Sequence, residues 1–274
     1  MQLFVHWAPS PDFLSFGGFS IKYYGVLWGA SLMSVFFICR YLFKQLGRDD
    51  EKVTLGIQYV FIGGLIGARL AHILFYSLDY YLQNPADIIA VWKGGLASHG
   101  GVVGGLVGLY LFCRNHKEFG FFWTMDISII AVPILASLIR LGNLMNSELC
   151  GRPTSVAWGF IFENSPEVSN ALPRHPVVLY ESIAYFLIQL LMFALFAKYK
   201  EKKPGLYLAT FLISVFTARF LLEFFKEPDG ALFFDAVSKT QLLNLPFIIA
   251  GLVLAYLMTA NKLSYGRQQN TQGI

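Results

Sequence analysis

Long apolar stretches alternate with short polar gaps along the whole chain of 274 residues. A membrane-spanning helix needs roughly 17–25 mostly apolar residues, because the hydrocarbon core of a bilayer is about 30 Å thick. Stretches that meet this length without an internal run of charges lie at about 21–43, 53–76, 96–113, 121–145, 178–197, 205–225 and 241–260. The pattern predicts an all-α, polytopic membrane protein with about seven transmembrane helices, which we take as a single integral membrane domain over 1–274.

Composition agrees with lipid as the main solvent. Hydrophobic residues make up 55% of the chain and charged residues only 14%, against about 25% charged in soluble domains. The apolar content excludes a disordered chain, and three cysteines exclude a disulfide scaffold. The net charge of +4 is spread over the polar gaps and forms no basic face, so no nucleic-acid partner is expected.

The basic residues also predict the orientation of the chain. Lysines and arginines are about twice as frequent in the loops after the first, third, fifth and seventh stretches as in the other loops, which places the N-terminus outside the cytoplasm and the C-terminus inside it. The first 20 residues contain no Lys or Arg, so we expect no cleaved signal peptide. Two outer loops are long, at about 77–95 and 147–177, and the second, rich in Pro, Asn, Ser and Gly, predicts a small cap outside the cytoplasm.

Polar side chains inside the apolar stretches share one depth, near the outer leaflet. An ionisable group at a helix centre costs at least ~2.5 kcal/mol on insertion scales, so each is a candidate for function. Five stretches contribute such groups: Tyr23, Tyr24, Arg69, His72, His99, Arg140, Asn143, Asn146, Arg219 and Glu223. Their common depth predicts one polar site there.

Structural interpretations of the same residues stay open. Arg219 and Glu223 are spaced for an intrahelical ion pair, Arg69 could snorkel or tie loops together, and His72 could serve packing. The tyrosines could belong to an interfacial aromatic belt.

The third stretch opens with Ser98-His99-Gly100-Gly101 and continues with glycines at four-residue spacing, which favours close helix packing. That packing leaves His99 unexplained. The start of a helix is electropositive, which favours a neutral histidine that can accept a proton. Arg140 and Arg219 suit a lipid phosphate, because guanidinium groups bind phosphate through two parallel hydrogen bonds.

The segment 140–152, which reads RLGNLMNSELCGR, closely resembles the signature R-x-G-N-F-x-N-x-E-x-x-G of bacterial prolipoprotein diacylglyceryl transferases. Its one departure is Leu144, where the family commonly has Phe. Further matches follow in family order: Tyr24-Gly25, Gly67-Ala68-Arg69, His99-Gly100-Gly101, Arg174-His175-Pro176, Leu179-Tyr180-Glu181, Arg219-Phe220-Leu221-Leu222-Glu223-Phe224-Phe225 and Glu227-Pro228-Asp229.

The resemblance implies a transferase of the bacterial inner membrane with its active site toward the periplasm. It would move the diacylglyceryl group of phosphatidylglycerol to the lipobox cysteine in the signal peptide of a prolipoprotein. A thioether forms and glycerol 1-phosphate leaves, which is the first step of lipoprotein maturation. The partners are then phosphatidylglycerol, the signal peptide and membrane lipid, and the family uses no metal or organic cofactor.

Roles for single residues follow from the residue chemistry together with this resemblance. His99, Arg140 and Arg219 are the predicted catalytic residues, with His99 as base or thiol-positioning group and the arginines on the phosphate. We expect Glu148 and Glu223 to orient the arginines. We also expect one cavity in the outer half of the membrane to be lined by His99, Arg140, Asn143, Asn146, Arg219 and Glu223. The predicted substrate-binding residues are Tyr24, Arg69, Gly100, Gly101, Arg140, Asn143, Asn146, Glu148, Gly151 and Glu223.

Two other classes of function remain open at this point. Intramembrane Arg, His and Glu also mark ion paths, so a lipid or ion transporter with an outer-leaflet polar site is the main alternative. A lipid-binding scaffold without catalysis is the other.

Overall fold

The computed structural model describes residues 4–168, 172–227 and 237–265, and most of these residues are helical. Six helices of the described chain are long and apolar enough to cross a membrane: α1 (Tyr23–Gln45), α2 (Asp50–Tyr76), α5 to α6 (Phe121–Met145), α7 (Val177–Tyr199), α8 with its 3-10 extension (Leu206–Phe225) and α9 (Lys239–Thr259). This confirms an all-α, multi-pass membrane protein.

The predicted stretch 96–113 corresponds to α4 (Ser98–Asn115), a helix rich in glycine that is not among those six. The count of seven and the orientation of the termini therefore stay predictions. The chain divides into two compact units, one made of Met1–Cys39 and Asp126–Ser264, the other of Arg40–Met125 and Tyr265–Ile274. The single domain predicted from the sequence stays a prediction as well.

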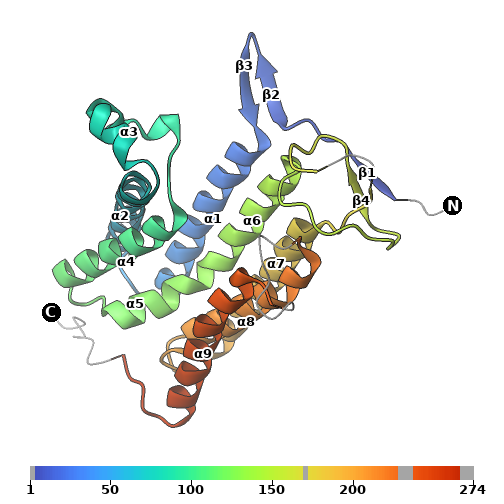
Figure 1. The fold of residues 1–274 in the computed structure, drawn as a ribbon. Coiled ribbons are helices and arrows are strands. Elements are labelled where there is room, and N and C mark those ends of the chain that lie inside the picture. The colour runs from blue at the N-terminus through green and yellow to red at the C-terminus, as the bar shows by residue number, and fades with distance from the viewer. Residues whose placement is uncertain (1–3, 169–171, 228–236, 266–274) are drawn as a thin grey trace. The chain divides into compact units, whose positions relative to one another are not determined.

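In the second unit, α2 and α4 run side by side through facing glycines (Figure 1). A Cβ atom on Gly104 would collide with the backbone of Gly63 and Gly67, and one on Gly100 would collide with Gly67 and Ala71. Such close backbone approach is the packing that small residues at four-residue spacing allow. The predicted role of these glycines in helix packing is confirmed.

The loop that follows α2 is folded around Arg69. It contains α3 (Leu78–Gln83) and the 3-10 helices η1 (Pro85–Ile89) and η2 (Val91–Lys93). The buried Arg69 guanidinium stacks over the Tyr81 ring at 4.9 Å and donates hydrogen bonds to backbone carbonyls between Asp87 and Gly95. One buried arginine thus holds the loop 77–95 on its helix.

The first unit carries a small β-containing cap. Strand β1 (Val5–Trp7) pairs in parallel with β4 (Phe160–Phe162), and β2 (Asp12–Phe16) and β3 (Phe19–Lys22) form an antiparallel hairpin above α1 (Figure 1). A hydrophobic cluster forms between β4 and the helices, and the Trp7 ring packs against it. Its buried members are Phe160 and Phe162 of β4, Leu144 of α6 and Val178 of α7. The cap predicted for 147–177 is therefore folded, and an N-terminal strand that was not predicted completes it.

The span formed by α5 (Phe121–Ser128), η3 (Ile129–Ala131) and α6 (Val132–Met145) is interrupted near Pro133. Proline breaks the helical hydrogen-bond ladder, and an unpaired backbone group is costly in lipid. The buried Gln189 side chain of α7 repairs the gap, since its amide donates to the Ile130 carbonyl at 2.9 Å and accepts from the Ile134 N–H at 3.0 Å. One glutamine side chain thus bridges the Ile130 carbonyl and the Ile134 N–H, which a regular helix would pair with each other.

A buried carboxylate caps the N-terminus of α8 in the same unit. Asp126 of α5 is fully buried and accepts hydrogen bonds from the backbone N–H groups of Gly205 and Leu208 at 2.9 and 2.7 Å. The first N–H groups of a helix have no partner within the helix. Asp126 therefore acts as a cap supplied by another helix.

We expect Asp126→Asn to lower the free energy of unfolding by about 1–3 kcal/mol, because an amide keeps one acceptor oxygen and loses the charge-assisted bond. Thermal unfolding in detergent measures the change. Asp79→Asn, at an exposed position of α3, is the matched control and should leave the unfolding temperature unchanged. Equal stability of the two variants would contradict the capping role of Asp126.

Candidate active site in the first unit

The end of α6 brings four of the predicted site residues into one hydrogen-bonded group. The Arg140 Nη1 atom donates to Asn143 Oδ1 at 3.2 Å. The Asn143 and Asn146 amides then donate to the two carboxylate oxygens of Glu148, each at 2.9 Å. Glu148 thus fixes both asparagines, and Asn143 in turn contacts the arginine.

A tight turn makes this arrangement possible. Ser147 and Leu149 have positive φ angles of 54° and 56°, and the Glu148 N–H donates to the Asn143 carbonyl at 3.0 Å. Non-glycine residues adopt this left-handed conformation rarely. The turn folds Glu148 back over the end of α6, where its carboxylate meets the two amides.

A buried carboxylate on α7 pairs with Arg140. Glu181 is 0% exposed; its Oε2 lies 2.6 Å from Arg140 Nε and its Oε1 accepts from Lys226 Nζ at 2.8 Å. Lys226 also lies 3.4 Å from Glu223 Oε2, and Glu223 Oε1 accepts from the Ser238 hydroxyl at 3.3 Å. Cations and carboxylates alternate, so every charge in this group has an opposite neighbour.

These contacts correct part of the sequence interpretation. Among the described contacts, neither Glu148 nor Glu223 pairs directly with an arginine: Glu148 holds the asparagines, and Glu223 contacts Lys226 and Ser238. The expectation that these two carboxylates orient the arginines stays a prediction. The intrahelical pair of Arg219 with Glu223 is also not among the ion pairs of the described residues. Glu181 and Lys226 were not predicted as site residues, although a carboxylate within a membrane span was a sufficient signal for Glu181.

Arg219 of α8 belongs to the same region as Arg140. Both Arg219 and Arg140 lie near the hydroxyl of Tyr185, which belongs to α7 one turn after Glu181 and is 1% exposed. The two arginines that the sequence assigned to the phosphate therefore have a common neighbour in the structure.

Tyr24 packs against the same stretch of α6. A Cβ atom on Gly142 would lie 2.9 Å from Cδ2 of the Tyr24 ring, so the glycine leaves the space that the ring occupies. Tyr24 is the second residue of α1, and Gly142 lies between Arg140 and Asn143 in sequence. The predicted tyrosine is therefore beside the signature segment.

Gly151 lies where three chain segments meet, which we call the Gly151 junction: Gly151-Arg152, Arg174-His175 and Phe225-Lys226. Backbone hydrogen bonds join Gly151 N–H to the His175 carbonyl at 3.1 Å and Arg152 N–H to the Phe225 carbonyl at 2.8 Å. A Cβ atom on Gly151 would lie 2.5 and 2.7 Å from those two carbonyl oxygens. Because Lys226 ends this junction, Gly151 fixes a residue that pairs with Glu181.

Cys150, beside the junction, is half-buried, and burial raises the pKa of its thiol. A raised pKa makes a thiol a poor nucleophile at neutral pH. Arg174 donates to the Gly151 carbonyl at 3.0 Å and to Glu227 at 2.6 Å. Pro228 and Asp229 of the family motif lie outside the described residues.

The other predicted site residues belong to the second unit. His99 is exposed in the first turn of α4, and Gly100 lies against α2. A Cβ atom on Gly101 would make only ordinary contacts, at 3.6 Å from the Ala68 Cβ. Arg69 holds the loop after α2, as described above. Their roles in substrate binding and catalysis, and the shared cavity with Arg140, stay predictions.

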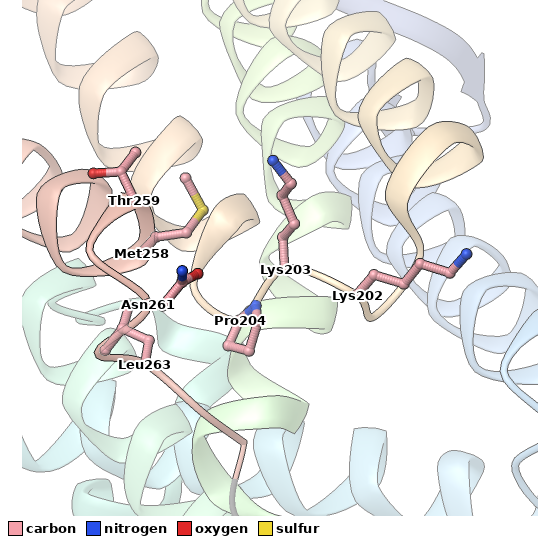
Figure 2. Close-up of a pocket in the computed structure, with 7 residues that line it drawn as sticks. All are labelled: Lys202, Lys203, Pro204, Met258, Thr259, Asn261 and Leu263. Carbon is pink, nitrogen blue, oxygen red and sulfur yellow. The ribbon is translucent and has the colours of Figure 1, made fainter.

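A hollow of about 350 Å³ lies at the opposite end of α7 (Figure 2). It is lined by Lys202, Lys203, Pro204, Met258, Thr259, Asn261 and Leu263. At 1.5 Å per helical residue, about 30 Å of α7 separates it from Glu181. It is therefore distinct from the charged group at Arg140.

We expect Gly151→Ala to abolish the activity of the protein and lower its stability, because the new methyl group would have to displace two hydrogen-bonded carbonyls. Thermal unfolding and the transfer assay described below measure both effects. Gly105→Ala is the matched control, since its Cβ would lie 3.6 Å from Val60 Cγ1 in ordinary contact. An active, stable Gly151→Ala protein would show that the junction tolerates a side chain.

The chain is similar to known proteins over most of its length, including the segments that form this site. The family model of prolipoprotein diacylglyceryl transferase matches residues 11–257. Proteins named phosphatidylglycerol–prolipoprotein diacylglyceryl transferase are similar to the chain over most of its length. The one from Tolumonas auensis is 40% identical over 261 residues, 94% of this chain and 99% of the relative.

The similar protein from Chloroherpeton thalassium is 44% identical over 255 residues, which cover 92% of this chain and 94% of the relative. That from Bacteroides fragilis is 38% identical over 272 residues, with 93% and 96% covered. The family match includes the α6 signature, Glu181 and the Arg219 segment. With that match and this degree of identity, the chain belongs to the prolipoprotein diacylglyceryl transferase family.

Proposed function

We propose that this chain transfers the diacylglyceryl group of phosphatidylglycerol to the lipobox cysteine of prolipoproteins, in the bacterial inner membrane, at a site toward the periplasm. The observation that carries the proposal is the arrangement around Arg140 in the first unit. Arg140 pairs with the buried Glu181. It also belongs to the hydrogen-bonded group of the family signature, which is formed by Arg140, Asn143, Asn146 and Glu148.

Arg140 and Arg219 bind the phosphate of the lipid. Arg140 is pre-oriented, because Glu181 holds its Nε and Asn143 contacts its Nη1. The phosphodiester has one negative charge, and it gains a second when the glycerol phosphate leaves. Fixed cations stabilise that developing charge without reorganising, which lowers the barrier. Tyr24 and the two asparagines contact the headgroup or the glycerol.

His99 accepts the proton of the substrate thiol. The thiolate sulfur then attacks the glyceryl carbon that bears the phosphate, a C–S bond forms and the C–O bond breaks. Glycerol 1-phosphate leaves with the electron pair of that bond. A free thiol has a pKa near 8.5 and reacts as the thiolate, so a base is needed near neutral pH. The thiol comes from the substrate, in keeping with the raised pKa of Cys150.

The polar groups deeper in the bundle argue against a transporter. Ser137 and Ser182 hydrogen-bond to each other and to each other's helix, and Gln189 repairs the ladder of α5 and α6. These side chains are committed to structural bonds, so they do not extend the charged group into an ion path.

One assay separates the three classes of function. The purified protein in phosphatidylglycerol vesicles is mixed with a lipobox peptide, and the mass of the peptide is measured. A gain of one diacylglyceryl group supports the transferase. Lipid or ion flux without product would support a transporter, and binding alone would support a scaffold.

Charge and geometry at the two arginines can be separated in this assay. We expect Arg140→Lys and Arg219→Lys each to lower transfer about 10- to 100-fold, because lysine keeps the charge and loses a charge-assisted hydrogen bond of roughly 1.5–3 kcal/mol. Alanine at either position should lower it further. Arg114→Lys, at the exposed end of α4, is the control and should be as active as the wild type. Wild-type rates in both lysine variants would show that a positive charge is sufficient at these positions and that the guanidinium geometry is not needed.

The role of His99 predicts a specific rescue. We expect His99→Gln to lose most transfer at pH 7 and to recover as the pH rises toward about 9.5, because the substrate thiol then ionises without a base. The pH profiles of the variant and the wild type measure this. Arg140→Lys should gain no such advantage from alkaline pH. A His99→Gln profile parallel to that of the wild type would exclude His99 as the base.

A further inference from the structure

The Tyr185 hydroxyl is a buried polar group of α7 that is not part of the hydrogen-bonded network around Glu181. The side chain is 1% exposed, yet its hydroxyl makes no hydrogen bond of accepted geometry with any described residue. A buried polar group normally has a partner. An unpartnered hydroxyl inside a membrane bundle is therefore an unusual and costly feature.

The surroundings of this hydroxyl define what it can bind. Arg140 and Arg219 lie near it, and guanidinium groups donate hydrogen bonds without accepting them. They can satisfy the phenolic oxygen but never its proton. Glu181 also lies near, one turn earlier on α7. Its Oε1 accepts from Lys226 and its Oε2 lies 2.6 Å from Arg140 Nε, and neither oxygen accepts a hydrogen bond from the Tyr185 hydroxyl. The hydroxyl proton therefore has no acceptor among the described residues, and two cations that would hold an incoming anion lie near it.

We propose that the Tyr185 hydroxyl is a further substrate-contacting group, which donates a hydrogen bond to a phosphate oxygen of the lipid between Arg140 and Arg219. The proposal rests on the transferase function proposed above. It adds a neutral donor to the two cations, and it explains why a hydroxyl is buried without a protein partner.

The contribution of this bond should grow during the reaction. As the C–O bond of the glyceryl group breaks, its electron pair stays on the phosphate, which becomes a dianion. A hydrogen bond to that oxygen strengthens as the charge develops, so it stabilises the transition state more than the bound substrate. Loss of the hydroxyl should therefore lower kcat more than it raises KM.

The test is Tyr185→Phe, which removes one oxygen and keeps the ring in the core. The matched control is Tyr207→Phe on α8, since Tyr207 is also fully buried but its hydroxyl donates to the Lys200 carbonyl. Transfer to a lipobox peptide in phosphatidylglycerol nanodiscs gives kcat and KM, and thermal unfolding gives the stability of each protein.

The two variants should respond in opposite ways. We expect Tyr185→Phe to keep or raise the unfolding temperature, because no protein bond is lost, and to lower kcat about 10- to 100-fold. Tyr207→Phe should lower the unfolding temperature and keep wild-type kcat per folded molecule.

Three results would overturn or separate the proposals. Wild-type kcat and KM in Tyr185→Phe would exclude a substrate contact. A less stable Tyr185→Phe protein would mean that the hydroxyl is bonded inside the protein, to Glu181 or Arg219, and would also overturn the inference. If the wild type itself transfers no lipid to the peptide, the proposed function fails, and the assay distinguishes that result from the other two.

Discussion

The charged site of this membrane protein depends on the pairing of one fully buried carboxylate. Glu181 contacts Arg140 through one oxygen and Lys226 through the other, so a charge from α7 joins α6 to the segment after α8. An unpaired ion in such a place would cost several kcal/mol. Because Lys226 also contacts Glu223 and Glu223 contacts Ser238, the start of α9 belongs to the same chain of contacts. Arg140 is therefore held by a chain of opposite charges that runs from α6 through α7 to the segment after α8.

Backbone geometry supports that pairing. The left-handed residues Ser147 and Leu149 return Glu148 to the end of α6, and Gly151 lets three segments approach within hydrogen-bonding distance. Neither the left-handed turn nor Gly151 contributes a side chain that would contact a substrate. Both determine where Asn143 and Lys226 lie, which is why a glycine within a family signature can matter as much as its charged residues.

The spans and several residues of the candidate site could be predicted from the sequence, because a lipid environment restricts which segments can cross it and where polar groups can lie. Apolar length predicts the spans, and the cost of polar groups within a membrane singles out Arg140, Asn143 and Arg219. Pairings could not be predicted in the same way. Glu223 lies four residues after Arg219 and three residues before Lys226, and it pairs with Lys226. Local spacing allows both pairs, so it could not choose between them. Arg69 carried no signal that would distinguish a ligand for phosphate from an anchor for backbone carbonyls. The strand pairing of β1 with β4 joins residues more than 150 positions apart, beyond what local patterns report.

The Gln189 amide that bridges the gap in the third of the six spans has a mechanical consequence. A helix bends most readily where its own ladder is interrupted, and here the two ends of the break are joined by a side chain from α7. Membranes differ in thickness, and spans adapt to them by tilting or kinking at modest cost. Such an adjustment would be taken up around Pro133, on the cytoplasmic side of Arg140 in the predicted orientation, so the outer half of α6 can keep its geometry while lipid composition varies.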